Sequence, residues 1–129
     1  MQDLIIPATA ETPAIHFSAG SRTLRIQGES YPENAMTFYA PIRNWLQSYL
    51  LQDGDDLIEV HFSLKYFNSS STKLLRSLIA LLDDAARAGK HIATYWYHDP
   101  EDDMMLEFGQ DLHDEFGALH VQVTPMEMA

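Results

Sequence analysis

The chain has 129 residues, no cysteine and a formal net charge of −11, from 19 acidic and 8 basic side chains. These numbers exclude disulfides, thiolate metal ligands and cysteine nucleophiles, and they argue against binding to nucleic acid or to an anionic membrane, so a protein partner is expected. The length predicts one domain over residues 1–129. The sequence has no basic leader and no apolar run of about 20 residues, so a cytoplasmic protein that does not insert into a membrane is expected.

The N-terminal part is predicted to form an extended lead-in and then a pair of short strands. The lead-in covers residues 9–13, and the strands follow at 15–18 and 23–27. The segment Ala19-Gly20-Ser21 between the strands is typical of a tight hairpin turn. The sheet is therefore expected to begin with a hairpin.

A long helix is expected after this hairpin. Ser30 and Glu33 have the spacing of a capping box at its start. The alternative is Tyr31 as the cap and Pro32 as the first helical residue. Pro41 removes one backbone donor and is expected to kink or split the helix. The buried stripe of the helix is predicted to consist of Ala35, Phe38, Tyr39, Ile42, Trp45, Leu46, Tyr49 and Leu50.

The middle of the chain reads as a strand followed directly by a second helix. After an acidic segment at 52–56, apolar and polar residues alternate over 58–66, which predicts a half-buried strand. Because one face of this strand is polar, helices are expected mainly on one side of the sheet. The amphipathic helix begins within 68–73 and ends at Gly89. Its apolar stripe consists of Leu74, Leu75, Leu78, Leu81, Leu82 and Ala85.

The C-terminal part adds a strand, a third helix and a last strand. The strand covers 91–97, and the acidic run 99–103 is expected to start the helix, where the helix dipole favours carboxylates. Gly109 is a weak point within this helix, and Gly117 ends it. The final strand is indicated by the alternating residues Leu119, Val121 and Val123.

The predicted order is therefore β-β-α-β-α-β-α-β. This order predicts an α/β fold with a single mixed, mostly parallel β-sheet and helices packed mainly on one face. Parallel β-α units place every helix N-terminus at the carboxyl edge of the sheet. The helix starts near Ser30, Ser69 and Asp99 are thus expected to share one rim.

The segment from Asn68 to Lys73 places four hydroxyl residues, Ser69, Ser70, Ser71 and Thr72, at a predicted helix start. Free backbone N–H groups and the helix dipole favour an anion there, so a phosphoryl group would be stabilised locally and would change the surface charge by about 1.5 to 2 units. An ordinary N-cap is the alternative explanation, although one residue suffices for a cap. The triplet at 68–70 also fits a glycosylation sequon, which nothing else in the chain supports.

No catalytic, cofactor or metal motif is found in the sequence. Six histidines lack the spacing of a metal site, although His16, His61 and His120 could share the open face of the sheet. The acid pair Asp83 and Asp84 is interpreted as part of a solvated helix face, not as a buried catalytic dyad. A small metal-dependent enzyme using the histidine-bearing face is the alternative from the enzyme class.

Several segments together resemble one protein family, the SiaC family of bacterial regulatory phosphoproteins. The resemblance extends over nearly the whole chain. The segments that carry it are Ile6-Pro7, Thr12-Pro13-Ala14-Ile15, Gly28-Glu29-Ser30-Tyr31-Pro32-Glu33-Asn34-Ala35, Pro41-Ile42, Trp45-Leu46, Tyr66-Phe67-Asn68-Ser69-Ser70-Ser71-Thr72-Lys73 and Trp96-Tyr97.

The resemblance implies a fold like that of STAS domains and a cycle of phosphorylation by a Ser/Thr kinase and dephosphorylation by a PP2C-type phosphatase. It implies that the unmodified form binds and activates a diguanylate cyclase, which raises cyclic di-GMP and promotes aggregation or biofilm. The modified residue in the family motif follows the asparagine and corresponds to Ser69, with Ser70, Ser71 and Thr72 less favoured. A partner-binding rim is expected around it, formed by Ser30, Tyr31, Asn68, Lys73 and Asp99. A STAS-type anti-sigma factor antagonist is the alternative binding module.

Overall fold

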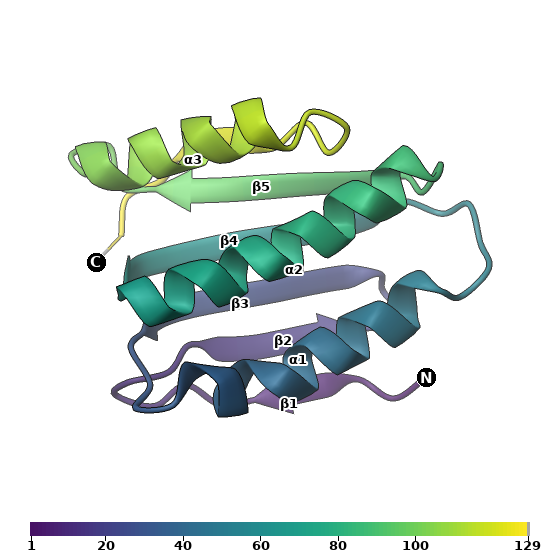
Figure 1. Ribbon diagram of the computed structural model, residues 1–129, viewed down its shortest axis with the longest axis horizontal. Helices are drawn as coiled ribbons and strands as arrows, with labels where there is room; N and C mark the ends of the chain where they lie inside the picture. The colour runs from purple at the N-terminus through teal and green to yellow at the C-terminus, as the bar shows by residue number, and fades with distance from the viewer. Residues whose placement is uncertain (129) are drawn as a thin grey trace.

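Alternating apolar and polar residues build a six-stranded sheet within residues 1–128, the part of the chain that this computed structural model describes. Its strands are β1 (Leu4–Ile6), β2 (Ala14–Ser18), β3 (Thr23–Ser30), β4 (Ile58–Phe67), β5 (Ile92–His98) and β6 (Gln122–Pro125). They lie side by side in chain order (Figure 1). Pairings from β1 to β3 are antiparallel and those from β3 to β6 are parallel, which confirms the predicted mixed, mostly parallel sheet.

The helices α1 (Ala35–Leu50), α2 (Ser69–Arg87) and α3 (Asp103–Glu115) cover one face of the sheet, as predicted (Figure 1). The pattern of β4 gives the reason, because its apolar row is buried against the helices while the residues between face the other side. That buried row consists of Ile58, Val60, Phe62 and Leu64. No helix within residues 1–128 is both long and apolar enough to cross a membrane.

Two features of the N-terminal half differ from the sequence prediction. The strand β1 was not predicted, because three residues are too few to show an alternating pattern. The helix α1 begins later than expected: its N-cap is Asn34, whose Oδ1 accepts the N–H of Thr37 at 3.1 Å. The capping roles predicted for Ser30 and Tyr31 are therefore wrong, since Ser30 is the last residue of β3. Pro41 is exposed within α1 and does not split it.

A β-bulge changes the end of β4. Its pairing with β3 shifts between Gly28 and Glu29, so that Glu29 pairs with Tyr66 and Lys65 is the extra residue. The alternation predicted through residue 66 is therefore wrong at its end: the Tyr66 side chain is 51% exposed. Phe67 instead faces the core, with its ring centroid 5.0 Å from that of Phe108.

The third helix packs closely on the sheet at Gly109. A Cβ atom placed there would lie 2.5 Å from Cδ1 of the buried Trp96. The indole N–H of Trp96 donates to the carbonyl of Met105 at 3.0 Å, which fixes the ring beneath α3. This glycine, predicted as a weak point of the helix, is required by the packing. The N-cap of α3 is Asp102, whose Oδ1 accepts the N–H of Met105 at 3.1 Å.

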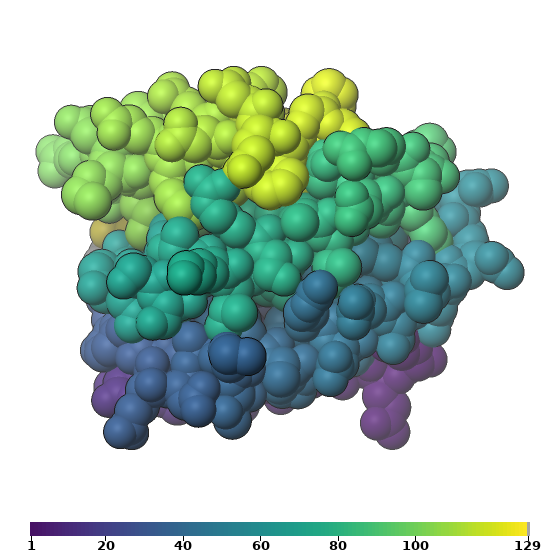
Figure 2. All heavy atoms as spheres, in the orientation of Figure 1, coloured from purple at the N-terminus to yellow at the C-terminus, as the bar shows by residue number. Residues whose placement is uncertain are grey.

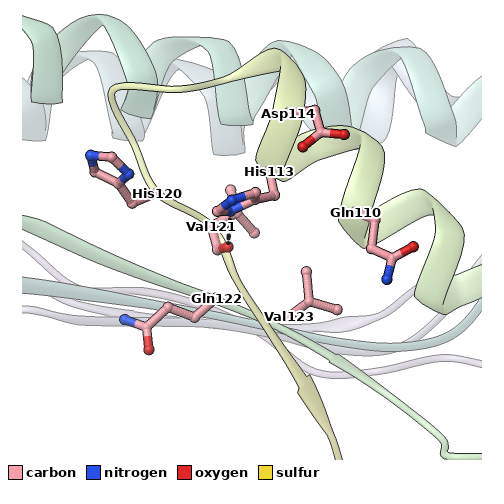
Figure 3. Close-up of a pocket in the computed structure, with 7 residues that line it drawn as sticks. All are labelled: Gln110, His113, Asp114, His120, Val121, Gln122 and Val123. Carbon is pink, nitrogen blue, oxygen red and sulfur yellow. Dashed lines mark hydrogen bonds between the residues drawn. The ribbon is translucent and has the colours of Figure 1, made fainter.

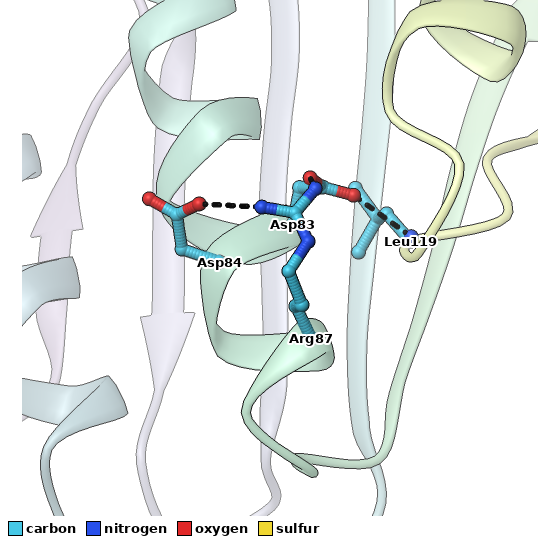
Figure 4. A network of polar contacts seen from close by, with 4 residues as sticks. All are labelled: Asp83, Asp84, Arg87 and Leu119. Carbon is cyan, nitrogen blue, oxygen red and sulfur yellow. Dashed lines mark hydrogen bonds and ion pairs between the residues drawn. The ribbon is translucent and has the colours of Figure 1, made fainter.

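Asp83 contradicts its interpretation as a solvated residue, because it is only 3% exposed. Its Oδ1 accepts the backbone N–H of Leu119 at 3.0 Å, and its Oδ2 lies 2.6 Å from Nη2 of Arg87 (Figure 4). The connection between α3 and β6 covers this side of α2, which a helical pattern cannot indicate. Asp84 is exposed, as predicted, and contacts Arg87 at 3.3 Å.

Candidate phosphoacceptor site and binding rim

The helix starts share one edge of the sheet. Because β3, β4 and β5 are parallel, their carboxyl ends lie on the same edge, where α1 and α2 begin at the left of Figure 1. The N–H of Asn68 donates to the carbonyl of Ser30 at 3.0 Å, so the end of β3 is bonded to the start of α2. This edge is the rim that the sequence predicted.

Asn68 is the N-cap of α2, and the hydroxyl run folds around it. Its Oδ1 accepts the N–H of Ser71 at 2.9 Å, and its carbonyl accepts both the N–H and the hydroxyl of Thr72 at 3.0 Å. Within residues 1–128 the N–H groups of Ser69 and Ser70 have no protein partner. Two free amide groups are therefore available to water or to an anion at this helix start.

Burial separates the four hydroxyl residues. Ser71 is fully buried, and its Oγ lies 2.9 Å from Oγ of Ser30, which in turn lies 2.6 Å from Oη of Tyr39. This buried hydroxyl triad joins β3, α1 and α2. Burial raises the pKa of Tyr39, opposed by its hydrogen bond with Ser30. A kinase cannot reach Ser71 here, and Thr72 is half-buried with its hydroxyl already bonded.

Ser69 and Ser70 are exposed and line a hollow of about 510 Å³ between the starts of α1 and α2. We call this the Ser69 hollow. Figure 2 shows the helix-covered face of the molecule, to which α1 and α2 belong. The other residues that line it are Glu33, Asn34, Ala35, Met36, Lys73 and Leu74. Met36 is 74% exposed, an apolar side chain directly beside the two hydroxyls.

The predicted rim residues fall into three groups. Tyr31, Asn68 and Lys73 lie at or beside the start of α2, and Tyr31 and Lys73 are exposed. Ser30 lies beneath this surface and, being buried, cannot contact a partner directly. Asp99 does not line the Ser69 hollow but a different one.

The carboxylate of Asp99 belongs to a turn after β5. It accepts the N–H groups of Glu101 at 2.9 Å and Met128 at 3.2 Å, and these bonds lower its pKa. Asp99 lines a separate hollow with Pro100, Glu101, Glu127 and Met128. Asp99 therefore does not line the Ser69 hollow; the pairing of β5 with β4 ends at Ser63, whereas β4 continues to Phe67.

Sequence reasoning missed two exposed residues of this rim. Tyr66 lies with its ring centroid 5.9 Å from that of Tyr31 in an edge-on pair, and both rings are exposed. The bulge turns Tyr66 outward. The sequence signal for this bulge was Gly28, a glycine within a strand, which adopts a φ of +124° in the structure. Met36 was hidden by the misplaced cap, because with Asn34 as N-cap it falls in the exposed first turn of α1.

Of the three histidines considered for a shared open face, His16 and His61 lie in one cross-strand row of that face, and His120 lies elsewhere. His61 is 8% exposed, its Nδ1 lies 2.8 Å from Oη of Tyr97, and burial lowers the pKa of its imidazole, with Arg25 lowering it further and Glu59 opposing. In the register of the sheet, Arg25 separates His61 from His16. No group of three or more metal-ligating side chains occurs within residues 1–128.

His120 lies at the other side of the molecule, in a hollow of about 740 Å³ between α3 and β6 (Figure 3). Its only histidine neighbour in this hollow is His113, whose Nδ1 lies 2.9 Å from the carbonyl of Val121. The geometry thus gives no support to the interpretation of these histidines as one catalytic or metal-binding face.

Comparison with known proteins gives consistent results. A model of the SiaC family regulatory phosphoproteins matches residues 6–126. An uncharacterized protein of Pseudomonas aeruginosa (strain UCBPP-PA14) is 31% identical over 115 residues, which are 89% of this chain and 90% of that protein.

Two solved structures from Pseudomonas aeruginosa share the fold. A chain of the crystal structure of the diguanylate cyclase SiaD in complex with its activator SiaC has a TM-score of 0.89 and 28% identity, over 96% of this chain and 100% of that chain. The crystal structure of apo-SiaC has a TM-score of 0.87 and 29% identity, over 96% of this chain and 99% of that chain. The predicted fold class and family resemblance are confirmed.

Proposed function

This chain belongs to the SiaC family of regulatory phosphoproteins, and we propose that it is a non-enzymatic switch controlled by phosphorylation of Ser69. A Ser/Thr kinase adds the phosphoryl group and a PP2C-type phosphatase removes it. The unmodified form binds and activates a diguanylate cyclase, and phosphorylation ends that binding.

The exposed position of Ser69 in the first turn of α2 is the observation that carries this proposal. Of the four hydroxyl residues, only Ser69 and Ser70 are exposed and line the Ser69 hollow. We assign the acceptor to Ser69 because it directly follows the N-cap Asn68, the position that is modified in the family motif that the chain resembles.

A phosphoryl group at Ser69 is compatible with the fold. The free N–H groups of Ser69 and Ser70 and the dipole of α2 favour an anion by about 0.3 to 1 kcal/mol. The modification adds about 1.5 to 2 negative charges to the rim. It therefore changes the surface that a partner meets and leaves the core unchanged.

The surroundings of Ser69 have the composition of a protein-binding surface. The exposed side chains of Tyr31, Tyr66 and Met36 lie around the start of α2. Tyrosine and methionine are enriched in protein interfaces, and a few aromatic residues often dominate the binding energy. The relative SiaC is the activator in a complex with the diguanylate cyclase SiaD, which supports a cyclase as the partner of this chain.

The test begins with the protein purified from its native host. Fragment masses measured with and without phosphatase treatment locate the phosphate, and the proteins that co-purify identify the partner. We expect phosphate on Ser69 and a diguanylate cyclase in the unmodified fraction. A sigma-binding kinase in place of the cyclase would favour the anti-sigma factor antagonist, and phosphate confined to Ser71 or Thr72 would refute the assignment of the acceptor.

A titration of the recovered cyclase then tests the switch itself. Unmodified protein and Ser69→Ala should bind equally well, because the substitution removes no charge, and the phosphorylated protein should bind at least 100-fold more weakly, since an uncompensated charge in an interface commonly costs several kcal/mol. Equal affinities of the phosphorylated and unmodified forms would show that the hydroxyl run is an ordinary helix cap.

A further inference from the structure

Lys73 lies one helical turn after the candidate phosphoacceptor. Ser69 and Lys73 are four residues apart in α2, and Ser70 and Lys73 are three apart, spacings that bring Cβ atoms to about 5 to 6 Å on one helix face. All three residues line the Ser69 hollow. The lysine ammonium can therefore reach a phosphoryl group on either serine.

Lys73 is also free to change partners. It is exposed and forms no ion pair within residues 1–128. The next cation of α2, Arg76, is bound to Glu115 and lies 5.1 Å over the ring of Phe108. The only other charged residue that lines the hollow is Glu33, which also forms no ion pair within residues 1–128. The local formal charge is thus balanced in a chain whose net charge is −11.

The direction of the switch restricts the chemistry of the partner at this hollow. A basic partner group placed here would be attracted by the phosphate, and phosphorylation would then strengthen binding. A switch that ends binding needs a partner group that the phosphate repels or displaces. A carboxylate meets this condition, because Lys73 attracts it in the unmodified protein and the phosphate competes for the same ammonium.

We propose that Lys73 is the cation through which phosphorylation acts. In the unmodified protein it pairs with a carboxylate of the docking protein, and after modification of Ser69 it pairs with the phosphoserine of its own helix. This inference rests on the proposed function. It adds a specificity-determining residue and states that the partner presents an acidic side chain to the Ser69 hollow.

The pair within the chain is tested without any partner. Phosphoserine is placed at position 69 during translation, and its second ionisation is followed by ³¹P NMR against pH in wild type, Lys73→Gln and Lys73→Arg. A nearby cation favours the dianion, so Lys73→Gln should raise the phosphate pKa by about 0.3 of a unit, the size expected for an exposed pair one turn apart, and Lys73→Arg should restore it. Lys65→Gln is the matched control, because this exposed lysine lies outside the hollow.

The partner half is tested by titrating the cyclase that co-purifies with the native protein. Unmodified Lys73→Gln should bind about 10-fold more weakly than wild type, whereas Lys73→Arg and Lys65→Gln should bind like wild type. Phosphoserine at position 69 should weaken wild-type binding at least 100-fold but Lys73→Gln binding by only about 10-fold, because the two changes act through one group.

Each result separates the inference from the function on which it rests. The same phosphate pKa in wild type and Lys73→Gln would refute the pair within the chain. Wild-type affinity of unmodified Lys73→Gln, or equal weakening of both proteins by phosphoserine, would refute the role of Lys73 and leave the switch intact. No weakening of wild type by phosphoserine would refute the proposed function itself, whatever the NMR result.

Discussion

Two acidic substitutions only two residues apart should have very different effects on stability. Ser69→Asp places a charge on the exposed first turn of α2, where the helix dipole favours it. Ser71→Asp places the same charge in the buried hydroxyl triad, where the Oγ of Ser71 lies 2.9 Å from that of Ser30 and its partners are hydroxyls. An uncompensated buried charge costs about 3 to 5 kcal/mol, whereas the change at Ser69 should stay below about 1 kcal/mol.

The assay is thermal and urea unfolding followed by circular dichroism. For a domain of this size about 1 kcal/mol shifts Tm by roughly 4 °C, so Ser71→Asp should lower Tm by about 12 °C or more and Ser69→Asp by less than about 4 °C. Ser71→Ala is the control for lost hydrogen bonding, with an expected loss of about 1 kcal/mol. Similar losses for both acidic variants would mean that Ser69 is a structural cap and that the burial argument is wrong.

Three further outcomes are expected. Gly109→Ala should lower the free energy of unfolding in urea by about 1 to 3 kcal/mol, because the new Cβ would lie 2.5 Å from the indole of Trp96. A stabilised variant would contradict this packing. Tyr66→Ala should weaken binding of the co-purifying cyclase about 10-fold or more with Tm nearly unchanged; unchanged affinity would remove this ring from the interface. The pKa of His61 is lowered in the folded protein, so the unfolded chain takes up this proton first as pH falls. The contribution of His61 to stability is therefore lost as pH falls below about 6.5. The stability of His61→Gln between pH 5 and 8 should depend less on pH than that of wild type, and identical pH profiles would contradict this assignment.

Local patterns predicted those features that depend on one segment alone. The order of the strands and helices from β2 onward, the helices on one face and a polar helix start within 68–73 follow from periodicity and capping chemistry within a few residues. The choice of Ser69 among the four hydroxyl residues came from the family resemblance, because the local pattern alone does not separate adjacent hydroxyls at a helix start.

The features that were missed depend on pairs of distant segments. The outward turn of Tyr66 requires the bulge between β3 and β4, and the burial of Asp83 requires a connection 36 residues further along the chain. Asp99 lines a hollow other than the Ser69 hollow, and the pairing of β5 with β4 ends before β4 itself does. None of these relations leaves a periodic signal in the segment that it affects.

The two edge strands limit how another protein can attach to the sheet. β1 contains only three residues, and β6 contains four and ends in Pro125, which has no backbone N–H. Short edges and prolines discourage the addition of a further strand. The molecule thus offers little template for backbone-mediated docking or for edge-to-edge aggregation, and recognition must rely on side chains, whose charge a single phosphoryl group can change.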